Sequence, residues 1–106
     1  MIARTWHGVV PLRYEEQFTN YLEETGVKDA KLLLGNHGAY THVVVQGEYV
    51  HFFLCTYWET MENVITYAGD KPEIAVTYPA DKDYKLISDP VVIHLEVNEA
   101  KNPFLK

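Results

Sequence analysis

The stretch His51-Phe52-Phe53-Leu54-Cys55-Thr56-Tyr57-Trp58-Glu59-Thr60 decides the fold of this chain. From His51 to Trp58 it has the aromatic and apolar residues of a β-strand, and neither of its alternating faces is polar. A strand that is apolar on both faces must be covered on both. We therefore expect helices against one face and, because the chain is short, a second copy of the chain against the other.

Length, charge and cysteine content narrow the class of protein. A chain of 106 residues can bury a modest core, and we expect one domain over residues 1–106. The net charge of -6 argues against a nucleic-acid partner, because phosphate contacts need clustered Lys and Arg. The single cysteine, Cys55, fits a reducing compartment. No apolar run approaches the roughly 18 residues of a membrane span, so we expect a cytoplasmic protein with no membrane partner.

The residues before this strand predict a strand, a helix and a hairpin. A first strand is expected at 2–9, followed by a helix at 11–25 that Gly26 ends. Residues 31–34 are expected to be extended and to run into a turn or bulge at 35–38. Strands at 39–46 and 49–58 flank Gly47-Glu48, which predicts a hairpin with a two-residue turn.

The residues after it predict a second helix and a last strand. Thr60 is the expected N-cap of a helix at 61–68, which Gly69 ends. A short helical turn is expected at 70–73, then a polar connection at 79–90. The last strand is expected at 91–97.

This order predicts an α+β fold of the ferredoxin-like βαββαβ type. Both helices then cover one face of a four-stranded antiparallel sheet. The other face carries either the set Tyr49, His51, Phe53, Cys55 and Tyr57 or the alternate set of the same strand. Either set is too apolar to face water, so we expect a homodimer through this sheet face.

A series of short motifs carries a family resemblance over nearly the full length. The motifs are Ile2-Ala3-Arg4-Thr5-Trp6, Gly35-Asn36-x-Gly38, Tyr57-Trp58-Glu59-Thr60-Met61-Glu62, Tyr67-Ala68-Gly69-Asp70, Ala75-Val76-x-Tyr78-Pro79 and Val92-x-His94-x-Glu96-Val97. In this ordered set the chain resembles the antibiotic biosynthesis monooxygenase family of dimeric α+β barrels. The ordered set is more specific for this fold than for any one reaction.

The resemblance implies a cavity between the helices and the sheet, lined by Trp58 at the exit of the third strand. Some members of the group oxidise aromatic polyketides with molecular oxygen and no metal or organic cofactor. Others bind and degrade haem, and others have no settled activity, so the fold by itself does not choose the reaction. The haem-degrading members use a His on or just after the second helix, and residues 59–78 contain none.

Arg4 and Trp6 share one face of the first strand and are the first site candidates. A buried Arg needs an anionic partner. Arg4 therefore either pairs with an internal carboxylate such as Glu96 or holds a phenolate, enolate or carboxylate of a substrate. By resemblance, Arg4 stands where the haem-degrading members have an Asn, which argues against their chemistry.

The other candidates each have a structural alternative. Trp58 is a pocket wall or a core tryptophan, and its neighbour Tyr57 points to the opposite, dimer face. Tyr67 and Tyr78 are hydroxyl donors or acids, or core residues with surface hydroxyls. Asn36 is an oxyanion donor or a turn residue. His37 could reach a cavity mouth, whereas the five histidines lack the spacing of a local metal site.

These observations favour a cofactor-independent monooxygenase, an oxidoreductase that acts on a small planar phenol-like or anthrone-like substrate. The expected catalytic residues are Arg4, Tyr67 and Tyr78, the expected substrate-binding residues are Trp6, Trp58, Asn36 and His37, and no cofactor or metal is expected. The alternatives are a non-enzymatic dimer that binds a small ligand, a haem-binding or haem-degrading protein, and an isomerase or decarboxylase that needs no oxygen.

Overall fold

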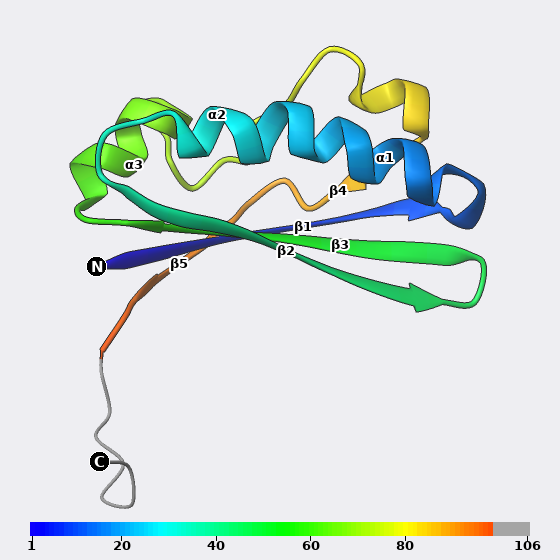
Figure 1. Cartoon of the computed structure of the whole chain (residues 1–106), viewed down its shortest axis with the longest axis horizontal. Coiled ribbons are helices and arrows are strands. Elements are labelled where there is room, and N and C mark those ends of the chain that lie inside the picture. The colour runs from blue at the N-terminus through cyan, green and yellow to red at the C-terminus, as the bar shows by residue number, and fades with distance from the viewer. Residues whose placement is uncertain (99–106) are drawn as a thin grey trace, which may run out of the picture.

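Strand β1 (Ile2–Pro11) lies at the centre of the sheet in the computed structural model, which describes residues 1–98. It pairs along its whole length with β3 (Tyr49–Trp58), and β3 pairs in turn with β2 (Asn36–Gln46). The two short strands β4 (Ile87–Ser88) and β5 (Ile93–Glu96) both pair with the other edge of β1. All pairings are antiparallel and helices lie against one face, so the expected ferredoxin-like α+β fold is confirmed (Figure 1).

The hairpin between β2 and β3 forms as expected. Gln46 pairs with Tyr49, and the backbone of Gly47 between them has φ 62°, a conformation that glycine adopts at no steric cost. At the other end of β2 the register shifts between Asn36 and Gly38, which confirms the expected bulge.

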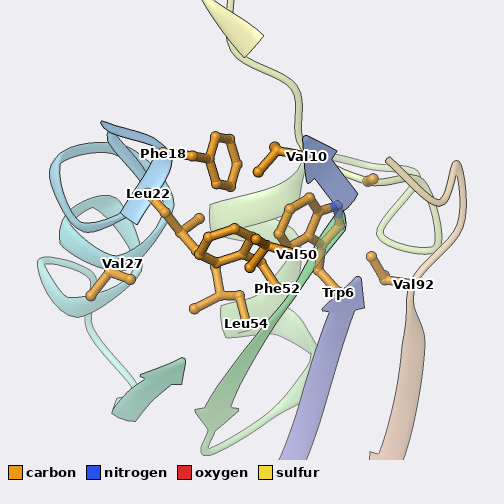
Figure 2. Packing of buried hydrophobic residues seen from close by; sticks show 10 residues of the cluster. Trp6, Val10, Phe18, Leu22, Val27, Val50, Phe52, Leu54 and Val92 are labelled. Carbon is orange, nitrogen blue, oxygen red and sulfur yellow. The ribbon is translucent and has the colours of Figure 1, made fainter. Parts of the chain in front are cut away.

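Strand β3 buries one of its two apolar faces under the helices. The buried set consists of Val50, Phe52, Leu54, Thr56 and Trp58. Figure 2 shows Phe52 and Leu54 close to Phe18 and Leu22 of the first helix. The opposite set, Tyr49, His51, Phe53, Cys55 and Tyr57, therefore faces away from the helices, and Tyr57 lies on the face where it was expected.

The first helical region is longer than expected. A 3₁₀ turn (Leu12–Tyr14) leads into α1 (Glu15–Leu22), a π-helical turn (Glu23–Val27) and α2 (Lys28–Lys31). The prediction that Gly26 ends this helix was wrong, and so was the extended piece at 31–34. Gly26 is buried, and a Cβ on it would lie 3.0 Å from Leu54 Cδ2. Its small size therefore lets the helix approach the sheet.

Helix α3 (Met61–Ala68) begins and ends as expected. The Thr60 hydroxyl accepts a hydrogen bond from the Asn63 amide at 3.3 Å, and Gly69 follows the last residue with φ 91°. No helix within residues 1–98 is both long and apolar enough to cross a membrane.

The chain after α3 differs most from expectation. Residues 70–73 form only a turn, closed by a bond from the Ile74 amide to the Lys71 carbonyl, and the connection at 79–90 contains a 3₁₀ turn (Asp81–Tyr84) and β4. The last strand expected at 91–97 is shortened to β5, and β4 is an additional strand within the residues expected to be a connection. The last strand starts late because residues 90–92 pair with residues 73–75 instead of with β1.

Truncating each of two valines that are cross-strand partners in the hairpin tests which part of this sheet face is buried in the core. Val50 is 0% exposed and its cross-strand partner Val45, on the same sheet face, is 53% exposed. We expect Val50→Ala to lower the free energy of unfolding by about 2 kcal/mol, since it removes buried methyl groups and leaves a cavity. Val45→Ala is the matched control and should change it by less than about 0.5 kcal/mol in urea titrations. Equal effects would contradict this orientation of β3.

Candidate functional site

A cavity lies between the helices and the covered face of the sheet. It is open to solvent on one side and has a volume of about 30 Å³. The wall is mostly apolar and comes from β1, α1, the π-helical turn, β3, α3 and the connection after α3. The lining residues are Arg4, Trp6, Phe18, Tyr21, Leu22, Thr25, Gly26, Leu54, Tyr67, Val76, Tyr78, Asp81 and Leu86.

Arg4 brings a buried positive charge to this cavity. The residue is 3% exposed, and its Nη2 donates to the carbonyls of Ile74 at 3.1 Å and Pro72 at 3.4 Å. Its guanidinium lies 5.5 Å from the centre of the Tyr67 ring, within the range of a cation–π contact. Burial lowers the pKa of Arg4. Backbone carbonyls, and not the carboxylate of Glu96, therefore hold this charge, and its Nε has no hydrogen-bond partner among the described residues.

Tyr67 and Tyr78 both line the cavity and present neutral phenols. The Tyr67 hydroxyl donates to the Gly26 carbonyl at 3.5 Å, and the Tyr78 hydroxyl donates to Asp29 Oδ2 at 2.7 Å. Burial raises the pKa of both hydroxyls, and the bond to Asp29 raises that of Tyr78 further. These groups are therefore hydrogen-bond donors at neutral pH and not bases.

The two tryptophans occupy different places. Trp6 lines the cavity, and its Nε1 donates to Ser88 Oγ at 2.7 Å. Trp58 is fully buried outside the cavity wall, where its Nε1 donates to Thr56 Oγ1 at 2.8 Å and its ring lies 5.3 Å from that of Tyr67. Trp58 is thus a core tryptophan behind Tyr67, and this placement corrects the expectation that it forms a pocket wall.

Asn36 and His37 lie at the end of the sheet and do not line the cavity. Asn36 Oδ1 accepts from the Gly38 amide at 2.9 Å, and its Nδ2 donates to the Gly38 carbonyl at 3.3 Å, which is turn chemistry. His37 is exposed and pairs with Glu59. The structure therefore brings Arg4, Tyr67, Tyr78 and Trp6 together and leaves Asn36 and His37 outside the group.

Tyr21 and Asp81 also line the cavity, although sequence reasoning did not select them. Asp81 Oδ2 accepts from the Tyr78 amide at 2.9 Å. Burial, with the adjacent charge of Asp81, raises the pKa of Tyr21 to about 12. In the sequence, only the position of Tyr21 on the apolar stripe of the helix pointed to a place in the cavity wall. No sequence signal pointed to Asp81 in the polar connection.

His94 is a further residue that sequence reasoning did not select. It is the cross-strand partner of Arg4, and its Nε2 is buried without a hydrogen-bond partner among the described residues. Burial lowers the pKa of His94, and the charge of Arg4 lowers it further. His94 is therefore a neutral imidazole at pH 7. Its pairing with Arg4 depends on strand register, which a single sequence does not give.

The comparisons with known proteins connect this fold to two solved structures. A protein from Deinococcus radiodurans described as a "putative antibiotic biosynthesis monooxygenase" matches with a TM-score of 0.62 and 17% identity over 96% of this chain and 97% of that one. Rv0793 from Mycobacterium tuberculosis matches with a TM-score of 0.53 and 14% identity over 95% and 100%. No family model and no curated protein matches the sequence. The chain shares the fold of these proteins, as the resemblance implied.

The bond between Tyr78 and Asp29 predicts a pH effect. Because the Asp29 carboxylate helps to raise the pKa of Tyr78 above its ordinary value of 10.0, Asp29→Asn should lower that pKa. A raised tyrosine pKa stabilises the folded state below about pH 10, and this contribution is lost as the pH rises through the folded value. The variant should thus have a lower free energy of unfolding at neutral pH, and its Tyr78 should ionise at a lower pH.

Tyrosinate absorbance and urea titrations measure both effects, and Tyr78→Phe identifies the Tyr78 signal. Asp83→Asn removes an exposed carboxylate from the 3₁₀ turn and is the matched control. An alkaline titration of Asp29→Asn that coincides with that of the unmodified protein would show that this bond does not control Tyr78.

Proposed function

We propose that this protein is a monooxygenase-like oxidoreductase of the antibiotic biosynthesis monooxygenase group that acts on a small planar aromatic molecule in the cavity. The observation that carries the proposal is the nearly complete burial of Arg4 at the cavity wall, where its buried donor Nε has no hydrogen-bond partner within residues 1–98. A buried cation with a free donor stabilises negative charge that develops on a bound molecule. The shared fold with a protein described as a "putative antibiotic biosynthesis monooxygenase" is compatible with this reaction class but does not by itself select it.

The reaction needs no redox group from the protein. An anthrone that has lost a proton is a carbanion, which gives one electron to molecular oxygen and recombines with it as a hydroperoxide at the same carbon. Loss of water then leaves a ketone, so that one oxygen atom enters the product and the other leaves with the two hydrogens of the methylene group. Arg4 stabilises the anion and Trp6 is an aromatic wall. To donate to a substrate oxygen, the hydroxyl of Tyr67 or Tyr78 must first release its present acceptor, the Gly26 carbonyl or Asp29 Oδ2.

The cavity must widen to take an aromatic ring, because its volume of about 30 Å³ holds little more than a water molecule and is far below that of ligand sites. The wall formed by Val76, Tyr78, Asp81 and Leu86 belongs to the connection after α3, which has one short 3₁₀ turn and no long element. This connection is the part of the wall that can move outward during binding.

Oxygen uptake tests the proposed reaction. Purified protein freed of metals with a chelator should consume oxygen with an anthrone above the rate of buffer and form the corresponding quinone. Arg4→Ala should reduce the rate by roughly a hundredfold, because it removes the charge that stabilises the anion. The matched control is Arg13→Ala, which removes an arginine on the 3₁₀ turn before α1, outside the cavity.

Two outcomes would contradict the reaction. No uptake above buffer would exclude oxygenation of anthrones, and binding of an anthrone without turnover would favour the non-enzymatic ligand-binding alternative. Equal turnover with and without oxygen would favour an isomerase or decarboxylase.

The face of the sheet away from the helices supports a homodimer. Large apolar side chains on it are more than half exposed, among them Tyr40, Val44, Ile87, Ile93 and Leu95. On this face His7 contacts His51 at 2.9 Å and Asp89 at 3.0 Å and stacks on Phe53, so both imidazoles are already hydrogen-bonded within the chain. Polar groups that are already hydrogen-bonded lower the cost of burying an apolar face. We propose that a second copy packs its sheet against this face, forming the dimeric α+β barrel.

Two leucine substitutions test the dimer. Leu95 is 56% exposed on the open sheet face, and Leu34 is 90% exposed on the turn before β2. Leu95→Glu should convert a dimer into a monomer at micromolar concentration, because it places a charge in the interface. Leu34→Glu should leave the mass unchanged. Light scattering after size exclusion measures both, and a monomeric unmodified protein would refute the proposal.

A further inference from the structure

His94 and Arg4 form a pair of polar side chains on the covered face of the sheet. They are direct cross-strand partners of β5 and β1, and such partners have Cβ atoms about 5 Å apart. The carbonyls that hold Arg4 belong to residues 72 and 74, and the Glu73 carbonyl between them accepts from the Val92 amide, two residues before His94. Both side chains therefore lie next to the same segment.

Each member of the pair has one buried nitrogen with no partner among the described residues. These atoms are Arg4 Nε and His94 Nε2. Buried polar atoms are nearly always hydrogen-bonded. Two buried nitrogens without a hydrogen-bond partner on cross-strand partners therefore suggest one shared ligand. The guanidinium Nε is always a donor, and a neutral imidazole donates from Nε2 in one of its tautomers. Two donors on directly opposed cross-strand residues can share one acceptor oxygen that carries negative charge.

The rest of the cavity offers one carboxylate, Asp81, as a base that could create that charge. The phenols of Tyr21, Tyr67 and Tyr78 hold their protons more strongly than usual. Asp81 is the only carboxylate in the described wall, and its Oδ2 is already bonded to the Tyr78 amide. A substrate that enters with its hydroxyl already ionised needs no base in the cavity.

We propose that Arg4 Nε and His94 Nε2 together bind the oxyanion of an acidic hydroxyaromatic, so that the cavity selects its ligand as the phenolate. This inference rests on the proposed function in using the same buried charge, and it names the ionised phenol as the ligand class. It adds His94, which lies beside Arg4 but does not line the cavity, as a binding residue that the ligand reaches past Arg4. Glu73, the other charged group that acts on His94, raises the pKa of the imidazole and so opposes the effects of burial and Arg4. The neutral imidazole is the form that adds a donor without a second buried positive charge beside Arg4.

The yellow colour of ionised 4-nitrophenol makes it a direct probe of this selection. This single ring cannot undergo the proposed oxygenation, so binding and turnover are measured separately. The protein should bind the phenolate at least roughly tenfold more tightly than the neutral phenol, as expected for a charge-assisted hydrogen bond. The apparent pKa of the bound probe should then fall by about one, seen as more yellow colour at a given pH. 4-Nitroanisole has nearly the same shape, cannot ionise and should bind at least tenfold more weakly.

Substitutions assign the effect to the pair. His94→Phe should abolish the preference for the phenolate, whereas His94→Gln, which keeps a side-chain donor, should retain most of it. Arg4→Lys should weaken binding of the phenolate by roughly tenfold, since a lysine cannot reproduce the Nε donor. His42→Gln, on the exposed part of β2, is the matched control and should leave binding unchanged.

The proposal fails if the bound probe is the neutral phenol, if neither probe binds, or if His94→Phe selects the phenolate as well as the unmodified protein does. If Arg4→Lys does not fold, the two His94 variants and the comparison of nitrophenol with nitroanisole decide the question alone. Phenolate binding without any oxygen uptake from anthrones would retain this site and reject the proposed reaction.

Discussion

The packing of one face of β3 against the helices is the interaction on which the rest of the structure depends. The ring centres of Phe52 and of Phe18 in α1 lie 4.9 Å apart in an edge-to-face contact. Val50, on the same face of β3 as Phe52, is completely buried. β1 is in register with β3 from Ile2 opposite Trp58 to Pro11 opposite Tyr49. A shift of one residue would turn every side chain of β1 to the other face. The packing of β3 therefore also determines that Arg4 lies on the helix side.

The placement of Arg4 explains why this cavity is suited to an anion. A buried charge without partners is strongly destabilising, and the protein compensates it with the carbonyls of Pro72 and Ile74 and with the ring of Tyr67. Both carbonyls belong to the segment after α3, which also pairs with residues 90–92. The same contacts thus position the charge and close the cavity. The compensation remains incomplete at Nε, and this is the physical basis of the proposed activity.

Much of the fold could be predicted because its signals are local. The alternation within β3, the Gly47 turn and the Thr60 cap each depend on residues that are close in sequence, and all three are confirmed. Gly26 shows where local reasoning fails. Glycine is a common helix end, but here its small size serves a contact with Leu54, far away in sequence. The late start of the last strand likewise depends on the pairing of residues 73–75 with 90–92.

The sequence by itself determined the order of the elements, the apolar character of both faces of β3 and the candidacy of Arg4, Trp6, Tyr67 and Tyr78. Periodicity and residue type are sufficient for these conclusions, because they describe neighbours along the chain. Only the tertiary structure decided that Trp58 lies behind Tyr67, that Asn36 and His37 lie outside the cavity, and that His94 lies beside Arg4. These facts depend on register and packing depth, which arise from contacts between residues distant in sequence.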